Sequence, residues 1–159
     1  MDINFPDGLK LIINQEVIDE INKYRQIDGS NESGGILLGK KELNNDTYVI
    51  SNVTVPSIYD RSSKTSFIRN KNCTQQQINE MWETSNGIVN YMGEWHTHSV
   101  NEPIPSITDK RLINQLYKDG TNVFRYFFMI ILGNTGNLFI GVVDSKFGGK
   151  FRYEKLMKG

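Results

Sequence analysis

The sequence predicts an α/β fold of the α+β type, a sandwich in which a mixed central sheet is flanked by helices. Three observations support this prediction. Strand-like and amphipathic helical segments are interleaved along the chain, and turn signals join several strands into hairpins. This irregular order argues against a doubly wound parallel sheet. With 159 residues and a hydrophobic fraction of 38%, residues 1–159 fit one domain around one core.

In the N-terminal part, apolar residues recur at spacings of three and four from Val17 to Tyr24, which predicts an amphipathic helix. The turn sequence Asn44-Asn45-Asp46 separates a glycine-flanked apolar run from a β-rich run, and this pattern predicts a hairpin. The expected elements are a strand over 9–13, a helix over 15–26, strands over 33–39 and 48–55, a loop over 56–64 and a short strand over 65–69.

The C-terminal part repeats the same mixture. A glycine-rich turn at 133–137 joins two strongly β-type runs, and Asp119-Gly120 is a stop signal for the preceding helix. The expected elements are a helix over 74–84, a strand over 88–98, a helix over 106–118, strands over 124–132 and 138–143, and a last strand over 147–156.

Composition excludes several classes of partner. Lys+Arg and Asp+Glu both number 18, so no global basic field exists to hold nucleic acid or an anionic membrane. The longest apolar run, 126–132, is far too short to span a bilayer, and no signal peptide is visible. The single cysteine, Cys73, favours a reduced, cytoplasmic protein with an inert thiol. Arg61, Lys64 and Arg69 form a basic stretch, which is most simply a solvated loop.

The only two histidines, His96 and His98, are the strongest chemical signal in the chain. Residues two apart point to the same face of a strand, whereas on a helix they would lie about 200° apart. Ser106 follows after a gap of seven residues and Asp109 after a further two, which places both on one face of a helix start. Two imidazoles and one carboxylate form a catalytic type of zinc set with an open fourth position. The segment therefore predicts one catalytic zinc ion.

Such a zinc site also needs a general base, and three glutamates compete for this role. Glu94 shares strand parity with the histidines, Glu102 lies in the connecting loop, and Glu32 precedes the glycine-rich strand. Spacing alone does not choose among them. Glu94 has two further interpretations, a partner that orients a ligand imidazole or a surface charge. Ser106 and Asp109 also fit a helix capping box, with or without a metal.

Taken together, two motifs resemble those of the JAMM (MPN+) metalloproteases. The downstream motif is His-Thr-His, seven residues, Ser, two residues and Asp, and the upstream motif is a glutamate followed by a glycine-rich strand over 32–39. Segment 91–98, Tyr-Met-Gly-Glu-Trp-His-Thr-His, resembles the bacterial branch in particular. The resemblance covers essentially the whole chain and implies the MPN sandwich, which is cytidine-deaminase-like. One departure is Ser99, because many members have proline after the second histidine.

The resemblance also implies roles for individual residues. His96, His98 and Asp109 would bind the zinc ion. Glu32 would be the general base, which takes a proton from the attacking water and later delivers one to the leaving amine. Ser106 would donate a hydrogen bond to the developing oxyanion.

The activity implied is hydrolysis of an isopeptide or peptide bond after the C-terminus of a ubiquitin-like protein. Bacterial relatives of this kind accompany conjugation machinery in anti-phage operons, and in CBASS systems such an enzyme releases a cGAS-like nucleotidyltransferase attached through its C-terminal tail. A peptidase that trims a sulfur-carrier protein is a similar alternative. From other classes, a non-catalytic MPN scaffold would typically lack a zinc ligand, and a RadC-like nucleic-acid module fits the neutral charge poorly.

Overall fold

The strands and helices follow each other in the interleaved order expected from the sequence. The computed structural model describes residues 1–119 and 123–159. The strands are β1 (Asp2–Asn4), β2 (Lys10–Ile13), β3 (Gly34–Lys41), β4 (Thr47–Val53), β5 (Arg61–Ser63), β6 (Ser66–Ile68), β7 (Asn90–Thr97), β8 (Tyr126–Leu132), β9 (Leu138–Asp144) and β10 (Phe151–Met157). The α-helices are α1 (Gln15–Asn22), α2 (Lys71–Thr84) and α3 (Ile107–Asp119), and two short 3-10 turns are η1 (Pro6–Gly8) and η2 (Ser145–Phe147).

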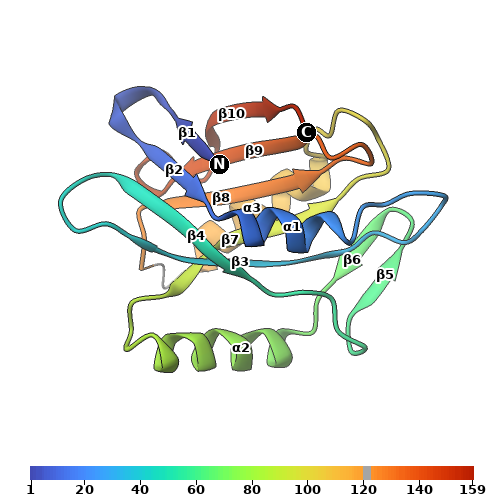
Figure 1. Ribbon diagram of the computed structural model, residues 1–159, viewed down its shortest axis with the longest axis horizontal. Coiled ribbons are helices and arrows are strands. Elements are labelled where there is room, and N and C mark those ends of the chain that lie inside the picture. Colours follow the sequence, from blue (N-terminus) through green and yellow to red (C-terminus); the bar gives the residue numbers. More distant parts are fainter. Residues whose placement is uncertain (120–122) are drawn as a thin grey trace.

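Eight of these strands form one curled sheet in the order β1-β2-β4-β3-β7-β8-β9-β10 (Figure 1). The pairs β2–β4 and β7–β8 are parallel, whereas the other neighbours in the sheet are antiparallel. The sheet is therefore mixed, as predicted. Because β7 lies between β3 and β8, the strand that carries the first histidine is hydrogen-bonded on both sides.

Helices cover both faces of the sheet, and strand β8 shows this most directly. Its residues alternate between two hydrophobic clusters, as expected for a strand that is buried on both faces. One cluster contains the apolar stripe of α1 (Val17, Ile18 and Ile21), and the other contains Ile113 of α3. Trp95 belongs to the α1 cluster, so His96, the next residue along β7, projects to the α3 side.

The β5–β6 hairpin is separate from the main sheet, since its two strands pair only with each other among the described residues. It leads into α2, which contacts β7 (Figure 1). The hairpin therefore needs other contacts to hold it in place, and these involve the candidate site described below.

Several boundaries differ from the predictions, and hydrogen bonds accompany the difference at two of the helix ends. Helix α1 ends at Asn22 rather than near residue 26. Gln26 therefore lies beyond the helix, where its buried side chain donates to the carbonyl oxygen of Lys64 (2.6 Å). Helix α2 begins at Lys71 because the side chain of Asn70 caps it by accepting from the Cys73 amide. Strands β1 and β5 were not predicted, and Gly120 of the predicted helix stop lies outside the described residues.

No helix that the structure describes is long and apolar enough to cross a membrane.

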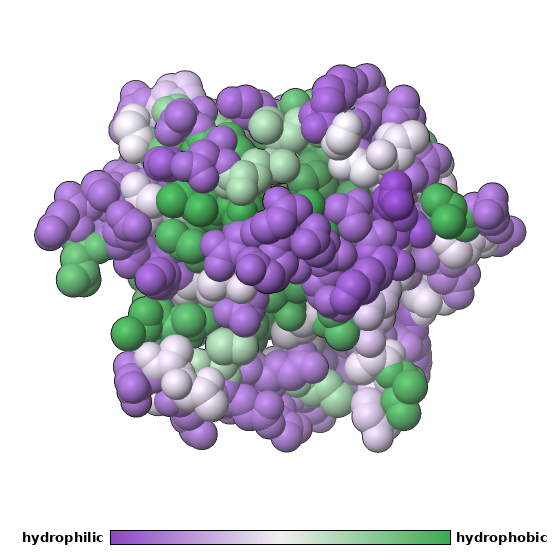
Figure 2. All heavy atoms as spheres, viewed as in Figure 1, coloured by the Kyte–Doolittle hydropathy of each residue, from purple (hydrophilic) through white to green (hydrophobic). Residues whose placement is uncertain are grey.

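Figure 2 shows the face that is viewed in Figure 1. Hydrophilic side chains cover its centre, where α1 lies, and the hydrophobic atoms gather in separate patches. Helix α1 thus turns its apolar stripe into the core and its polar side outwards.

Candidate metal centre and active site

The sheet positions both histidines through backbone hydrogen bonds. His96 lies opposite Gly34 on one side and beside Ile131 on the other. His98 follows the strand, and its amide donates to the carbonyl oxygen of Leu132 (2.9 Å). The two imidazole Nε2 atoms are 3.2 Å apart, so the structure brings the two rings to one point as strand parity predicts.

The first turn of α3 brings Asp109 to the same point. The Asp109 amide donates to Ser106 Oγ (3.1 Å), and the Ser106 amide donates to Asp109 Oδ2 (2.6 Å), which is the reciprocal pattern of a capping box. Asp109 Oδ1 lies 3.2 Å from His96 Nε2, and Oδ2 lies 3.4 Å from His98 Nε2. The capping box is therefore present, and it also orients the carboxylate towards both imidazoles.

Glu32 reaches this cluster through the pairing of β3 with β7. Because Gly34 lies opposite His96, continuing the antiparallel register places Glu32 opposite His98, on the same face. The carboxylate Oε1 of Glu32 lies 3.9 Å from His98 Nε2. The amide of Glu32 donates to the carbonyl oxygen of Ser63 in β5 (2.7 Å), and the side chain is only 8% exposed.

Glycine is required at the start of β3 because the neighbouring strands leave no room for a side chain. A Cβ at Gly34 would lie 2.7 Å from the carbonyl oxygen of Trp95 and 3.2 Å from Cβ of His96. A Cβ at Gly35 would lie 2.2 Å from the carbonyl oxygen of Thr54. The glycines thus allow β3 to approach the strand that carries His96.

The donor set fits a tetrahedral zinc ion. Zinc binds imidazole and carboxylate donors at about 2.0–2.2 Å, so two donors on one tetrahedral ion lie about 3.3–3.6 Å apart. The two histidine Nε2 atoms are 3.2 Å apart, and Asp109 contacts them through different oxygens, Oδ1 at 3.2 Å from His96 and Oδ2 at 3.4 Å from His98. Each of these separations is close to this range. Glu32 forms a possible metal-binding group of its own with His96 and His98, since ligand-type atoms of these three residues all lie within 4.8 Å of one another, but its 3.9 Å separation from His98 is longer than such an edge. These distances suit three metal ligands with a carboxylate beside them.

The two carboxyl groups of the cluster have opposite pKa shifts. Burial alone would raise the pKa of Asp109, but hydrogen bonds from His96 and His98 outweigh it and hold the pKa below its usual range. Burial raises the pKa of Glu32, and the nearby imidazoles oppose this only in part. Asp109 is thus set to stay ionised, as a ligand must, whereas Glu32 is easier to protonate, as suits a group that accepts and returns a proton.

The other two glutamates considered as the base lie in different surroundings. Glu102 is exposed and forms an ion pair with Lys158. Glu94 is only 5% exposed, so its interpretation as a surface charge is wrong. The hydrogen-bond partners of Glu94 are the Arg69 guanidinium and the Tyr91 hydroxyl rather than an imidazole. Among the three candidates, the geometry therefore favours Glu32.

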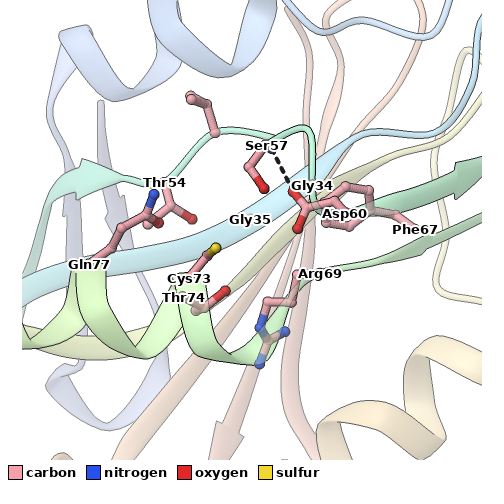
Figure 3. A pocket seen from close by; sticks show the side chains of 11 residues that line it. Gly34, Gly35, Thr54, Ser57, Asp60, Phe67, Arg69, Cys73, Thr74 and Gln77 are labelled. Atoms are coloured by element: carbon pink, nitrogen blue, oxygen red, sulfur yellow. Dashed lines mark hydrogen bonds between the residues drawn. The ribbon is translucent and has the colours of Figure 1, made fainter.

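A small pocket, partly open to solvent, lies beside the start of β3 (Figure 3). Gly34 and Gly35 form part of its wall, and the half-buried free thiol of Cys73 on α2 also lines it. Arg69 is another lining residue and is only partly exposed, so the interpretation of its basic stretch as a solvated loop is wrong for this residue.

Two supporting features were missed by the sequence analysis. Thr97 is fully buried, and its Oγ1 accepts from the Ser33 amide (3.0 Å), which fastens the segment carrying Glu32 to the strand carrying His96. The pair of Arg69 and Glu94 is the second feature. Strand parity placed Glu94 on the histidine face, but nothing in the sequence indicated a partner 25 positions upstream.

The comparisons with known proteins agree with this geometry. A curated relative from Escherichia coli named "CD-NTase/cGAS isopeptidase" is 37% identical over 100 residues, which cover 62% of this chain and 63% of the relative. A Vibrio cholerae relative with the same name is 32% identical and covers 63% of this chain and 64% of the relative. The match thus spans less than two thirds of the length of either relative.

The fold has a solved counterpart as well. The solution structure of a Desulfitobacterium hafniense protein covers 84% of this chain and 88% of its own, with a TM-score of 0.56 and 18% identity, and at this identity it supports the fold alone. The family model "Prokaryotic homologs of the JAB domain" matches residues 14–142, which include every residue of the candidate site. The expected resemblance and MPN-type fold are thereby confirmed, and the chain belongs to the prokaryotic JAB domain family.

Proposed function

We propose that this protein is a zinc-dependent isopeptidase that hydrolyses the bond after the C-terminal tail of a conjugated cGAS-like nucleotidyltransferase, within CBASS anti-phage defence. The observation that carries the catalytic part is the set of donor separations among His96, His98 and Asp109, with Glu32 beside them. The names of the relatives support the class of substrate. We propose further that residues 1–159 act as one catalytic domain.

His96, His98 and Asp109 would bind one zinc ion, with a fourth position left for water or substrate. When bound, zinc supplies a Lewis acid that makes water nucleophilic at neutral pH and polarises the scissile carbonyl. Asp109 suits this role because the capping box orients its carboxylate, and the two imidazoles suit it because backbone hydrogen bonds to β3 and β8 fix both residues.

The remaining chemistry belongs to Glu32 and Ser106. Glu32 accepts a proton from the attacking water as the C–O bond forms, and it returns that proton to the amine nitrogen as the C–N bond breaks. The raised pKa of Glu32 helps the first transfer, since a more basic carboxylate accepts a proton more readily. Ser106 Oγ already accepts from the Asp109 amide, so its own hydrogen is free to be donated to the developing oxyanion.

The rival functions differ in what they require of this site. A non-catalytic scaffold needs neither two histidines that converge with an aspartate nor a buried glutamate beside them, and both features are present here. A ubiquitin-like protein or a sulfur-carrier protein would present a similar tail to the same residues, so the substrate must be chosen by experiment. We also propose a cytoplasmic location, since a half-buried free thiol suits a reducing compartment.

The decisive experiment offers the zinc-loaded protein three sets of reporter fusions. The junctions carry the C-terminal tails of bacterial cGAS-like nucleotidyltransferases, ubiquitin-like proteins or sulfur carriers. We expect cleavage immediately after a nucleotidyltransferase tail, and we expect it to stop when a chelator removes zinc and to return when zinc is restored. Cleavage of another set would change the substrate, and cleavage that survives complete zinc removal would contradict the mechanism.

A further inference from the structure

The pair of Arg69 and Glu94 lies close to the candidate centre but takes no part in the chemistry proposed above. Glu94 is on β7, two residues before His96, and it is only 5% exposed. The Arg69 guanidinium forms an ion pair with Glu94 Oε1, and the Tyr91 hydroxyl donates to the same oxygen (3.2 Å). A buried ion pair seldom stabilises a fold more than apolar side chains of similar volume would, so this one is better explained by what it holds in place.

Arg69 connects β7 to the β5–β6 hairpin. It directly follows β6 and precedes Asn70, the residue that caps α2. Among the residues that the structure describes, the pair it forms with Glu94 is the one ion pair that joins this hairpin to the eight-stranded sheet. The end of the hairpin nearest to α2 is therefore fixed to the strand that carries His96.

The same hairpin also holds Glu32. In β5, the carbonyl oxygen of Ser63 accepts from the Glu32 amide (2.7 Å), and at the hairpin turn the carbonyl oxygen of Lys64 accepts from Gln26 (2.6 Å). The Glu32 backbone is held from two sides, by Ser63 of the hairpin and through its neighbour Ser33, which is hydrogen-bonded to Thr97 of β7. A shift of the hairpin would therefore strain the backbone at Glu32 but not at His96, whose hydrogen bonds lie within the main sheet. The hairpin thus helps to set the distance between the glutamate and the histidines, together with the hydrogen bonds between Ser33 and Thr97.

We propose that Arg69 and Glu94 are positioning residues, which fix the β5–β6 hairpin against β7 and thereby hold the Glu32 carboxylate beside His98. This inference rests on the proposed role of Glu32 as the base. A displacement of about 1 Å at a reacting group can lower a rate by about 10²-fold, so the pair can affect turnover without touching substrate. Zinc binding should be unaffected because none of the three proposed ligands depends on the hairpin.

The main test is the double variant Arg69→Met/Glu94→Leu. It removes both charges together and keeps similar volumes, so it avoids the unpaired buried charge that either single change would leave. With the fusion that the wild type cleaves, we expect about one zinc per chain, a kcat lowered by about 10- to 100-fold and a nearly unchanged KM.

Arg69→Lys keeps the charge but offers fewer donors, and its kcat should fall between those of the wild type and the double variant. Arg61→Met, an exposed change in the same hairpin, is the matched control and should behave as the wild type.

A second measurement does not need a substrate. Hydrogen exchange at the Glu32 amide should be about tenfold faster in the double variant, whereas exchange in β8 and β9 should not change. The proposal is wrong if the folded double variant has the kcat of the wild type, if its defect lies in KM or zinc content, or if the Glu32 amide keeps its protection. A wild type that cleaves no fusion, or a Glu32→Gln variant that stays active, would instead overturn the proposed function, and the exchange result would still show whether the pair anchors the hairpin.

Discussion

The two halves of the candidate site differ in the parts of the fold that fix their backbones. The metal half, His96, His98 and Asp109, is supported by strands on both sides of β7 and by a capping box at the start of α3. The base half is Glu32, which precedes β3 and whose backbone amide contacts a separate two-stranded hairpin. Metal ligands must converge on one ion, whereas the base must be placed accurately for proton transfer without binding that ion, so different contacts can hold the two parts. Substitutions should therefore separate metal binding from turnover.

The largest effect is expected from changes in the metal half. Asp109→Ala removes one of the three proposed ligands, so we expect zinc content to fall well below one per chain and kcat/KM to fall by at least about 10³-fold. Zinc is measured by elemental analysis of the purified protein, and Asp109→Asn separates ligand loss from cap loss because asparagine preserves the hydrogen bond to the Ser106 amide. Asp19→Ala, an exposed change on α1, is the control. Normal zinc content in Asp109→Ala would remove Asp109 from the ligand set.

A change in the base half should affect turnover alone. Glu32→Gln keeps the shape of the side chain but cannot accept the proton, so we expect kcat to fall by about 10²- to 10⁴-fold at normal zinc content. Steady-state kinetics and elemental analysis on the same sample check both parts, with the exposed change Glu16→Gln as control. Loss of zinc in this variant would show that Glu32 is a metal ligand, and the separation of the site into a metal half and a base half would then be wrong.

Ser106 should show a smaller, mixed effect because it serves both the helix cap and the oxyanion. Ser106→Ala should lower kcat by about 10- to 100-fold and cost about 1 kcal/mol of unfolding free energy. Ser106→Thr retains a hydroxyl for both roles and should preserve most of the activity. Kinetics and denaturant unfolding measure the two effects separately. If Ser106→Ala loses stability but turns over as the wild type does, the residue is a cap only.

The smallest effect concerns the stability of the metal-free protein. Burial raises the pKa of Glu32 above its ordinary value of 4.5, so the folded state holds this proton more tightly than the unfolded state does. The resulting stability is present below the unfolded pKa and is lost as pH rises through the folded pKa. We therefore expect metal-free Glu32→Gln to melt at a higher temperature than the metal-free wild type at pH 7, with a difference that shrinks on acidification. If metal-free Glu32→Gln melts at a lower temperature than the metal-free wild type at pH 7, the ionised Glu32 carboxylate stabilises the fold, which would contradict a raised pKa.

Much of the metal half could be predicted from local sequence. Strand parity is a property of any extended backbone, so His96 and His98 had to share a face once 88–98 was taken as a strand. Likewise, a serine and an aspartate three apart at a helix start form a capping box through local hydrogen bonds. The hairpin of β3 and β4 and the apolar stripe of α1 also follow from short-range patterns.

The base half depended on pairing between distant segments. Glu32 lies opposite His98 because β3 pairs with β7 in one register, and a shift by one residue would turn its side chain to the other face. The same holds for Arg69, which is a solvated residue by local composition and becomes partly buried only when the hairpin meets β7.

The sequence by itself thus determined the order of the elements, the two-histidine face and the helix cap, since these depend on neighbours along the chain. The family resemblance implied Glu32 rather than Glu94 or Glu102 as the base, but only the tertiary structure placed Glu32 beside His98 and revealed that Glu94 is buried against Arg69. The physical reason is that register and burial are set by side chains packing across the sheet, and a single strand does not contain that information.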